Sequence, residues 1–222
     1  MISGGLSKIR NEMKTVISNC GRKLSDINLI GVSKTKPLGM IIDAFELGLK
    51  DIGENYVEEF SQKHSDYNPG GLNYHFIGRL PTKKVRKVVG KAKLIHSVDS
   101  LKLAKKIDFV SSEEKVCQEI LIQVNQGGEL SKSGLDQDSL ELFFSEILAL
   151  KNIKIKGLMS IPPFGEPARP YFQELCKLRN SLQQSLGIDL PYLSMGMSGD
   201  FREAIEEGST HIRVGTAIFG SR

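Results

Sequence analysis

The sequence lacks several features that would assign it to a particular class of protein. It contains no tryptophan and only three cysteines, and no apolar run approaches the roughly 20 residues needed to cross a membrane. Its first residues, MISGGLSKIRNEMK, include no continuous apolar stretch of the kind found in a secretory signal. The cysteines are odd in number and form no CxxC pair, so we expect free thiols, a reducing cytoplasmic location and no zinc site.

Low-complexity tracts are also absent, and the composition of 40% hydrophobic and 25% charged residues is typical of a globular protein with a sizeable core. The net charge of +4 is unevenly distributed, because the segment from Arg79 to Lys106 has ten basic residues and one acidic residue, which gives it a charge of +9. A nucleic-acid-binding surface is one interpretation of this segment. We favour the alternative of solvated helix faces, because no aromatic residues interleave the lysines.

The chain alternates short apolar runs, which are typical of strands, with segments of helical periodicity. Eight strands are expected, at 27–33, 49–53, 73–78, 93–98, 118–125, 153–160, 191–196 and 210–215. Helices are expected at 4–20, 38–48, 55–65, 81–90, 100–112, 136–150, 167–186 and 200–207. This alternation predicts a parallel sheet, and eight strands in this length favour a closed (β/α)₈ barrel over an open sheet. No linker divides the chain, so we expect residues 1–222 to form one domain, with 4–20 as an extra N-terminal helix outside the barrel or across one end.

In a barrel of this type the functional groups lie at the C-terminal ends of the strands. The stretch GVSKTKP (31–37) places Lys34 and Lys36 directly beyond the first expected strand. A lysine there is either an ordinary surface residue or a partly dehydrated amine over the mouth of the barrel, where burial favours the neutral form. Pro37 starts a helix beside Lys36, and on this local pattern both lysines remain candidates.

The loops after the seventh and eighth strands, SMGMSGDF (194–201) and RVGTAIFG (213–220), are rich in small residues. These two positions form the recurring phosphate site of such barrels, because glycine lets backbone N–H groups approach an anion. We expect Asp200 to cap the following helix. Hydroxyl donors and close-approach glycines are available at Ser198, Gly199, Gly215 and Thr216.

The last strand, THIRVG, contains an arginine whose side chain should point into the barrel. Strand alternation puts His211, Arg213 and Gly215 on one face and Ile212 and Val214 on the helix-facing side. An inward arginine needs a partner, which is either a carboxylate or an acceptor on a ligand. A structural salt bridge between Arg213 and Glu54 is the alternative to ligand binding.

Two further polar residues occur at strand ends. Asn55 follows the second strand in GENYVEE, and His75 lies within the third, NYHFIG. Taken alone, the asparagine is equally explained as a helix cap and the histidine as a hydrogen-bonded core residue.

A lysine amine, an anion-binding cradle and an inward arginine around one barrel mouth together fit an aldehyde that carries a phosphate, and pyridoxal 5′-phosphate (PLP) is such a molecule. A Schiff base requires the neutral amine of lysine. An arginine at the pyridine nitrogen would disfavour protonation of that nitrogen and make the ring a poorer electron sink.

The sequence resembles the pyridoxal phosphate homeostasis proteins, small relatives of the N-terminal barrel of alanine racemase. The matching stretches are GVSKTKP, GENYVEE, HFIG, SKSGL (131–135), GLMSIPP (157–163), LSMGMSGDFREAI (193–205) and HIRVGTAIFG (211–220). The resemblance implies that Lys34 carries the cofactor with Asn55 and His75 near it, that Ser198, Gly215 and Thr216 hold the phosphate, and that Arg213 faces the pyridine nitrogen. One departure is HFIGRLPTKK (75–84), where Pro81 and Thr82 replace the polar side chains usual in the family.

The resemblance implies a PLP carrier that buffers the cofactor and delivers it to apo-enzymes, without turnover of its own. An amino-acid racemase is the alternative, and a nucleic-acid-binding module is the third hypothesis. A two-base racemase needs an acid–base group on each face of the cofactor, and no spacing argument makes Tyr56, Tyr74 or Tyr192 the second base. Because the chain stops at Arg222, just beyond the eighth strand, we expect no racemase-type C-terminal domain and a monomer.

Overall fold

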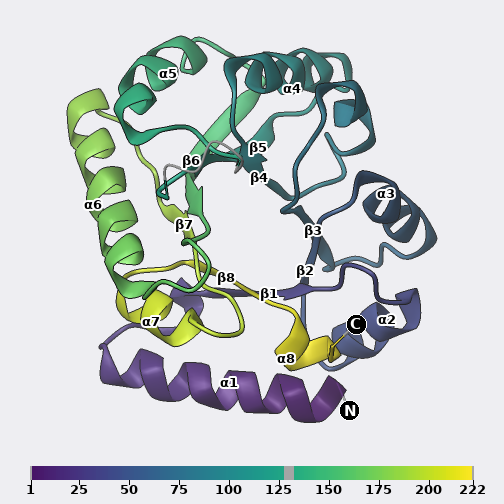
Figure 1. Ribbon diagram of the computed structural model, residues 1–222. Helices are drawn as coiled ribbons and strands as arrows, with labels where there is room; N and C mark the ends of the chain where they lie inside the picture. The colour runs from purple at the N-terminus through teal and green to yellow at the C-terminus, as the bar shows by residue number, and fades with distance from the viewer. Residues whose placement is uncertain (1, 128–132, 222) are drawn as a thin grey trace.

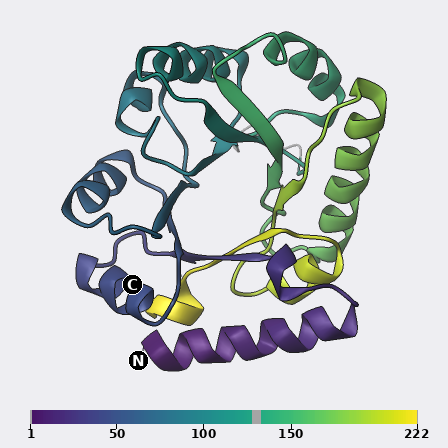
Figure 2. The same cartoon turned by 180° about the vertical axis from the view of Figure 1, so that it is seen from behind.

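Eight parallel strands close into a barrel, and helices surround it (Figure 1 and Figure 2). The computed structural model describes residues 2–127 and 133–221. Met1, Arg222 and residues 128–132, which include the first two positions of SKSGL, lie outside the described residues. The predicted (β/α)₈ fold is confirmed.

Each strand overlaps the apolar run that predicts it, and each pairs in parallel with its neighbours in chain order, with β8 closing on β1. The strands are β1 (Asn28–Val32), β2 (Asp51–Glu54), β3 (Asn73–Phe76), β4 (Leu94–Val98), β5 (Gln118–Val124), β6 (Ile153–Ser160), β7 (Tyr192–Ser194) and β8 (His211–Val214). Because all eight run in the same direction, their C-terminal ends meet at one end of the barrel, which we call the mouth.

The α-helices are α1 (Ile2–Asn19), α2 (Leu38–Glu46), α3 (Val57–Asp66), α4 (Leu101–Glu113), α5 (Leu140–Ile147), α6 (Arg169–Leu186), α7 (Phe201–Glu206) and α8 (Thr216–Phe219). Short 3₁₀ helices lie at η1 (Leu24–Asp26), η2 (Thr82–Lys87) and η3 (Gln137–Ser139). None of the described helices is long and apolar enough to span a bilayer.

Three helical segments differ from the expectation. The expected helix at 81–90 is only the 3₁₀ helix η2, and the expected helix at 136–150 is divided between η3 and α5. A 3₁₀ helix rises about 2.0 Å per residue against about 1.5 Å in an α-helix, so a short connection between β3 and β4 covers more distance in this form. The single-turn helix α8 gives too little periodicity to be predicted.

The two faces of the strands bury different kinds of side chain. Their outward side chains join the helices in one large apolar cluster. A separate small cluster of Leu94, Leu121 and Met159, with Tyr192 against it, belongs to four different strands and lies inside the barrel. Polar side chains also lie in the interior: the rings of His75 on β3 and His211 on β8, two strands that do not pair, lie 6.2 Å apart between centroids.

Helix α1 packs along the outside of the barrel against α2, α7 and α8 (Figure 1 and Figure 2). Its buried stripe is Ile2, Leu6, Ile9, Met13, Val16 and Ile17. Gly5 is the point of closest approach, because a Cβ atom there would lie 2.4 Å from the carbonyl oxygen of Ala217 in α8. Since α8 follows directly on the β8 loop, this contact fixes a helix that begins at the mouth.

We predict opposite effects for two neighbouring glycines of α1. Gly4→Ala should stabilise the protein by roughly 0.5–1 kcal/mol, because a Cβ there meets nothing within 4 Å and alanine is the better helix former. Gly5→Ala gains the same propensity but forces α1 and α8 apart, an overpacking cost of about 1–3 kcal/mol. Denaturant unfolding of both variants measures the difference, and equal stabilities would show that α1 and α8 do not pack this closely.

Candidate functional site

The two candidate lysines have different surroundings. Lys34 lies just beyond β1 and is half-buried, between Ser33, which is buried, and Thr35, which is exposed. Thr35 adopts a left-handed conformation, with φ of 63°. The Lys36 amine donates to the backbone carbonyl of Ser221, 2.6 Å away, so this ammonium group is engaged with the C-terminal segment.

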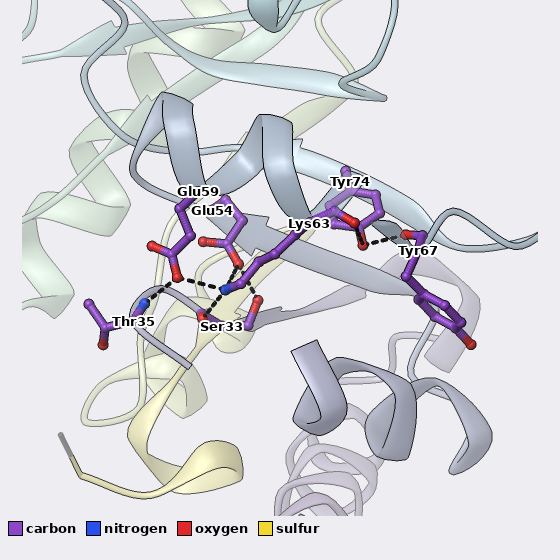
Figure 3. Close-up of polar contacts among 7 residues, drawn as sticks. All are labelled: Ser33, Thr35, Glu54, Glu59, Lys63, Tyr67 and Tyr74. Carbon is purple, nitrogen blue, oxygen red and sulfur yellow. Dashed lines mark hydrogen bonds and ion pairs between the residues drawn. The ribbon is translucent and has the colours of Figure 1, made fainter. Parts of the chain in front are cut away.

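Glu54, at the end of β2, is completely buried and forms its polar contacts with residues other than Arg213. Its Oε1 accepts hydrogen bonds from Ser33 Oγ at 2.6 Å and from Lys63 Nζ at 2.7 Å (Figure 3). Burial raises the pKa of the Glu54 carboxyl, although the hydrogen bonds from Lys63 and Ser33 act in the opposite direction. The alternative of an Arg213–Glu54 salt bridge is therefore wrong.

Arg213 points into the barrel, as strand alternation predicts, and only 4% of it is exposed. Its guanidinium donates to Ser194 Oγ at 2.5 Å and to the Ser160 carbonyl at 3.0 Å. Both acceptors are neutral, and among the described residues no carboxylate forms an ion pair with it. Burial lowers the pKa of Arg213 to about 10, with the charge of Asp200 opposing the shift. The arginine is therefore still a cation at neutral pH, but one without a contacting counter-ion.

A chain of hydrogen bonds runs from this arginine across the barrel interior. Ser194 Oγ lies 2.8 Å from Nδ1 of His96, whose Nε2 lies 3.0 Å from Nδ1 of His75. The Nε2 atom of His75 in turn lies 3.0 Å from Oδ1 of Asp51. We call these five residues, Arg213, Ser194, His96, His75 and Asp51, the interior chain.

With neutral imidazoles, one direction of hydrogen-bond donation agrees with both ends of the interior chain. Burial alone would raise the pKa of Asp51, but the hydrogen bond and charge of His75 hold it below its ordinary value, so Asp51 is an acceptor. His75 Nε2 then donates to Asp51, and its Nδ1 accepts from His96 Nε2. Because Nε2 of the neutral His96 carries the hydrogen, its Nδ1 is an acceptor, and the Ser194 hydroxyl, which accepts from the guanidinium, donates to it. All donors point from the buried cation towards the carboxylate.

Two of the buried histidines, His96 and His211, are held neutral. Burial, together with the charges of His75, His211 and Arg213, lowers the pKa of His96 well below its ordinary value. Burial also lowers the pKa of His211 to about 3. Both ring nitrogens of His75 are used within the interior chain. His75 is therefore linked to Arg213 through His96 and Ser194, and it has no ring nitrogen left for a group at the mouth.

The loops after β7 and β8 bring two predicted residues together. Thr216 Oγ1 donates to Ser198 Oγ at 3.3 Å, and both residues lie at least partly exposed at the mouth. A Cβ atom at Gly215 would press on Val32, 3.3 Å from its carbonyl oxygen, so a larger residue would disturb the end of β1. The expectation for Asp200 needs correction, because it occupies the position before α7 but accepts from the backbone N–H of Met197 and makes no side-chain cap of that helix.

Polar atoms with unmet hydrogen-bonding capacity lie at the mouth. Oδ1 of Asn55, directly after β2, and Oγ of Ser160, the last residue of β6, are both buried without a hydrogen-bond partner in the described part of the chain. Buried polar atoms are normally satisfied. Asn55 follows directly on the mouth end of β2, so its free oxygen indicates that a donor outside the protein completes this position.

Sequence reasoning missed Ser160, Ser194, His96 and Asp51. Ser194 stands at an inward position near the end of β7, and strand alternation would have marked it. Ser160 follows Met159 on β6 and reaches Arg213 only through its backbone carbonyl, which alternation does not reveal. The hydrogen bonds of His96 and Asp51 depend on the register between β2, β3 and β4, which no single strand encodes.

We predict that acid destabilises the protein through its buried histidines. His96 and His211 have folded-state pKa values below the ordinary 6.5, so the unfolded chain binds more protons and stability falls as the pH drops below about 6.5. Each of these two histidines should lower the free energy of unfolding by about 2 kcal/mol as the pH falls from about 7 to about 5. Denaturant unfolding across this range gives the slope of the unfolding free energy against pH, and His211→Asn should reduce that slope by about half. A flat profile would show that these imidazoles are accessible to protons.

Comparison with known proteins shows which family has a similar sequence. The family described as "Alanine racemase, N-terminal domain" matches residues 6–222. The pyridoxal phosphate homeostasis protein of Aquifex aeolicus is 43% identical over 220 residues, which cover 98% of this chain and 96% of that protein. The Escherichia coli protein of the same name is 34% identical, covering 100% of this chain and 97% of that one.

Solved structures agree with these relatives. PipY of Synechococcus elongatus, whose structure has PLP bound, is 33% identical with a TM-score of 0.88, covering 99% of this chain and all of that one. Alanine racemase from Corynebacterium glutamicum shares the fold, with a TM-score of 0.73 at 17% identity, covering 98% of this chain and 61% of the racemase. The barrel, the matched family and the near full-length relatives lead to one conclusion: this chain belongs to the pyridoxal phosphate homeostasis protein family.

Proposed function

We propose that the protein binds PLP as a Schiff base on Lys34 and serves as a carrier that holds the cofactor without turning over a substrate. The observation that carries the proposal is Arg213, a buried cation whose partners within the described ranges are neutral. A buried charge without a counter-ion is costly. An acceptor supplied by a ligand, such as an unprotonated pyridine nitrogen, offsets that cost.

The remaining mouth residues match the other groups of the cofactor. The neutral Lys34 amine attacks the aldehyde carbon, a C=N bond forms, and the carbonyl oxygen leaves as one water molecule that takes up the two amine hydrogens. Ser198, Thr216 and the N–H groups next to Gly215 are the donors we assign to the phosphate. The unsatisfied Asn55 Oδ1 is available to a hydroxyl donor on the ring. Bound PLP supplies an electrophilic aldehyde and a conjugated ring.

His75 takes a different role from the one that the resemblance implies. Because both its ring nitrogens are engaged, we assign it to the support of Arg213 through Ser194 and His96. The directed donors of the interior chain favour a charged guanidinium, since every dipole along it places its negative end towards the arginine. A charged Arg213 can only donate to the pyridine nitrogen and so keeps that nitrogen unprotonated.

This electrostatic arrangement favours a carrier over a racemase. An unprotonated pyridine nitrogen makes the ring a poor electron sink, and a racemase also needs a second base. The Tyr74 hydroxyl is turned towards Tyr67 and donates to its carbonyl at 2.7 Å. Tyr192 packs against His211 inside the barrel, with ring centroids 4.6 Å apart, and Tyr56 is 51% exposed to solvent.

The basic segment supports the nucleic-acid hypothesis less well than its composition suggests. Lys84 and Lys87 both pair with Glu58, and Arg86 pairs with Glu113 and Glu114. These acidic residues lie outside the Arg79–Lys106 segment and offset part of its charge. Nucleic-acid binding is thus the weaker hypothesis. We propose further that the whole chain acts as one PLP-binding unit and that the protein is a cytoplasmic monomer. Its protein partners in this proposal are apo-enzymes that receive the cofactor.

Lys34 and Lys36 provide a matched pair of variants for testing attachment. Reduction of the PLP-loaded protein with borohydride, followed by peptide mass spectrometry, should place the pyridoxyl label on Lys34. Lys34→Ala should lose the visible absorption band of the Schiff base while its circular dichroism spectrum stays unchanged, and Lys36→Ala should keep the band. A label on Lys36, or a band that survives in Lys34→Ala, would contradict the assignment.

The carrier and racemase hypotheses separate in two assays of the loaded protein. PLP should pass from it to a PLP-dependent apo-enzyme and restore that enzyme's activity, while racemisation of alanine or other amino acids stays at the level of free PLP. Racemase turnover that disappears in Lys34→Ala would reverse the assignment. Failure to reactivate any apo-enzyme while the Schiff base remains stable would indicate storage of PLP without delivery.

A further inference from the structure

A buried lysine on α3 lies close to the backbone of the Lys34 loop. Lys63 is 6% exposed, and its Nζ atom donates to three acceptors: the Ser33 carbonyl at 2.8 Å, Glu54 Oε1 at 2.7 Å and Glu59 Oε1 at 2.7 Å (Figure 3). The ammonium group therefore joins three elements, the end of β1, the end of β2 and the first turns of α3. Only 8% of its side chain is exposed, which is unusual for a lysine.

The same cluster contacts the residues on both sides of Lys34. On one side, Ser33 Oγ donates to Glu54 Oε1 at 2.6 Å and the Ser33 N–H donates to the Gly53 carbonyl at 3.1 Å. On the other side, the Thr35 N–H donates to Glu59 Oε1 at 2.7 Å. Figure 3 shows the Lys63 amine between the two carboxylates, with Ser33 and Thr35 below them.

Thr35 shows why such support is needed. Its φ of 63° is a conformation that non-glycine residues adopt at a cost and keep only where the surroundings impose it. The Glu59 carboxylate binds the N–H of this residue, and Glu59 is in turn held by Lys63. Loss of the cation would thus remove the restraint on the strained residue directly after Lys34.

The charges in the cluster depend on Lys63. Two carboxylates share its single ammonium, and Oε2 of Glu54 is buried without a partner in the described ranges. Without the cation, two acidic groups and the Ser33 carbonyl would face one another, with only the neutral donors Ser33 Oγ and the Thr35 N–H left to the carboxylates. Breaking one side of a buried ion pair is strongly unfavourable for that reason, so Glu59, the more exposed acid, would swing out to solvent and release Thr35.

We propose that Lys63 is a positioning residue for Lys34, which holds residues 33–35 in the one conformation that presents the Lys34 amine to the mouth. The inference rests on the proposed function, because it assigns to Lys63 a part in Schiff base formation. It goes beyond that function by naming a second lysine, one that touches no cofactor, as a determinant of how fast the first one reacts.

The test compares covalent attachment with non-covalent binding. In Lys63→Met, the rate of Schiff base formation with PLP, followed by its visible absorption, should fall by roughly ten- to a hundredfold, as expected for a displaced reacting group. Pyridoxine 5′-phosphate, which has an alcohol in place of the aldehyde, should bind with nearly unchanged affinity. Hydrogen exchange of the Thr35 amide should accelerate in the same variant, with or without ligand.

A milder set of variants covers the case in which Lys63→Met does not fold. Glu59 is partly exposed, so Glu59→Ala should fold while removing the acceptor of Thr35 and one partner of Lys63. It should slow Schiff base formation, and Glu59→Gln, which keeps an oxygen at that place, should restore most of the rate. Glu58→Ala, one residue earlier and paired on the surface with Lys84 and Lys87, is the matched control and should react at the wild-type rate.

The outcomes separate this inference from the proposed function. If the wild-type protein forms no Schiff base at Lys34, the proposed function fails. If the wild type forms the Schiff base and both Lys63→Met and Glu59→Ala form it at the wild-type rate, the positioning role is wrong while the carrier function stands. Equal losses in Schiff base rate and in pyridoxine 5′-phosphate affinity would also overturn it, because they would indicate general damage to the barrel.

Discussion

The buried guanidinium of Arg213 is the constraint on which the rest of the site depends. It is a cation in the barrel interior, and the groups that contact it are a serine hydroxyl and a backbone carbonyl. A protein that only needed this arginine for packing would place a carboxylate beside it. Here the compensating carboxylate, Asp51, lies at the far end of the interior chain, with three side chains between.

This separation has a chemical consequence. Neutral dipoles aligned along the interior chain stabilise the cation without neutralising it, and the guanidinium keeps further N–H groups for a ligand acceptor. A ligand acceptor that meets Arg213 is then held by a charged donor that does not give up its proton at neutral pH. Under the proposed function, the same feature that favours PLP binding disfavours carbanion chemistry on the bound ring, and one electrostatic arrangement would account for binding without turnover.

Much of this could be predicted from the sequence, because the relevant signals are local. Apolar runs locate all eight strands, and alternation in THIRVG turns Arg213 inward. The helix at 81–90 was wrongly expected, because the buried valines of that segment fit a 3₁₀ helix as well as an α-helix. The Arg213–Glu54 pairing failed because charge alone does not show that Glu54 already has a partner in Lys63.

The residues that sequence reasoning missed have non-local partners. Glu59 and Lys63 stand four residues apart on α3, which in a sequence reads as an ordinary solvent-exposed helix pair. Only the packing of α3 on the ends of β1 and β2 buries this lysine against Ser33. The interior chain likewise needs the register of β2, β3, β4, β7 and β8 before its members meet.

The most direct test of the central claim is a crystal structure of the protein with PLP bound. The account predicts continuous density from Lys34 Nζ to the cofactor, with the Arg213 guanidinium within hydrogen-bonding distance of the pyridine nitrogen and still bound to Ser194. A cofactor seated elsewhere, or an Arg213 that turns away from the ring to pair with a carboxylate, would contradict it.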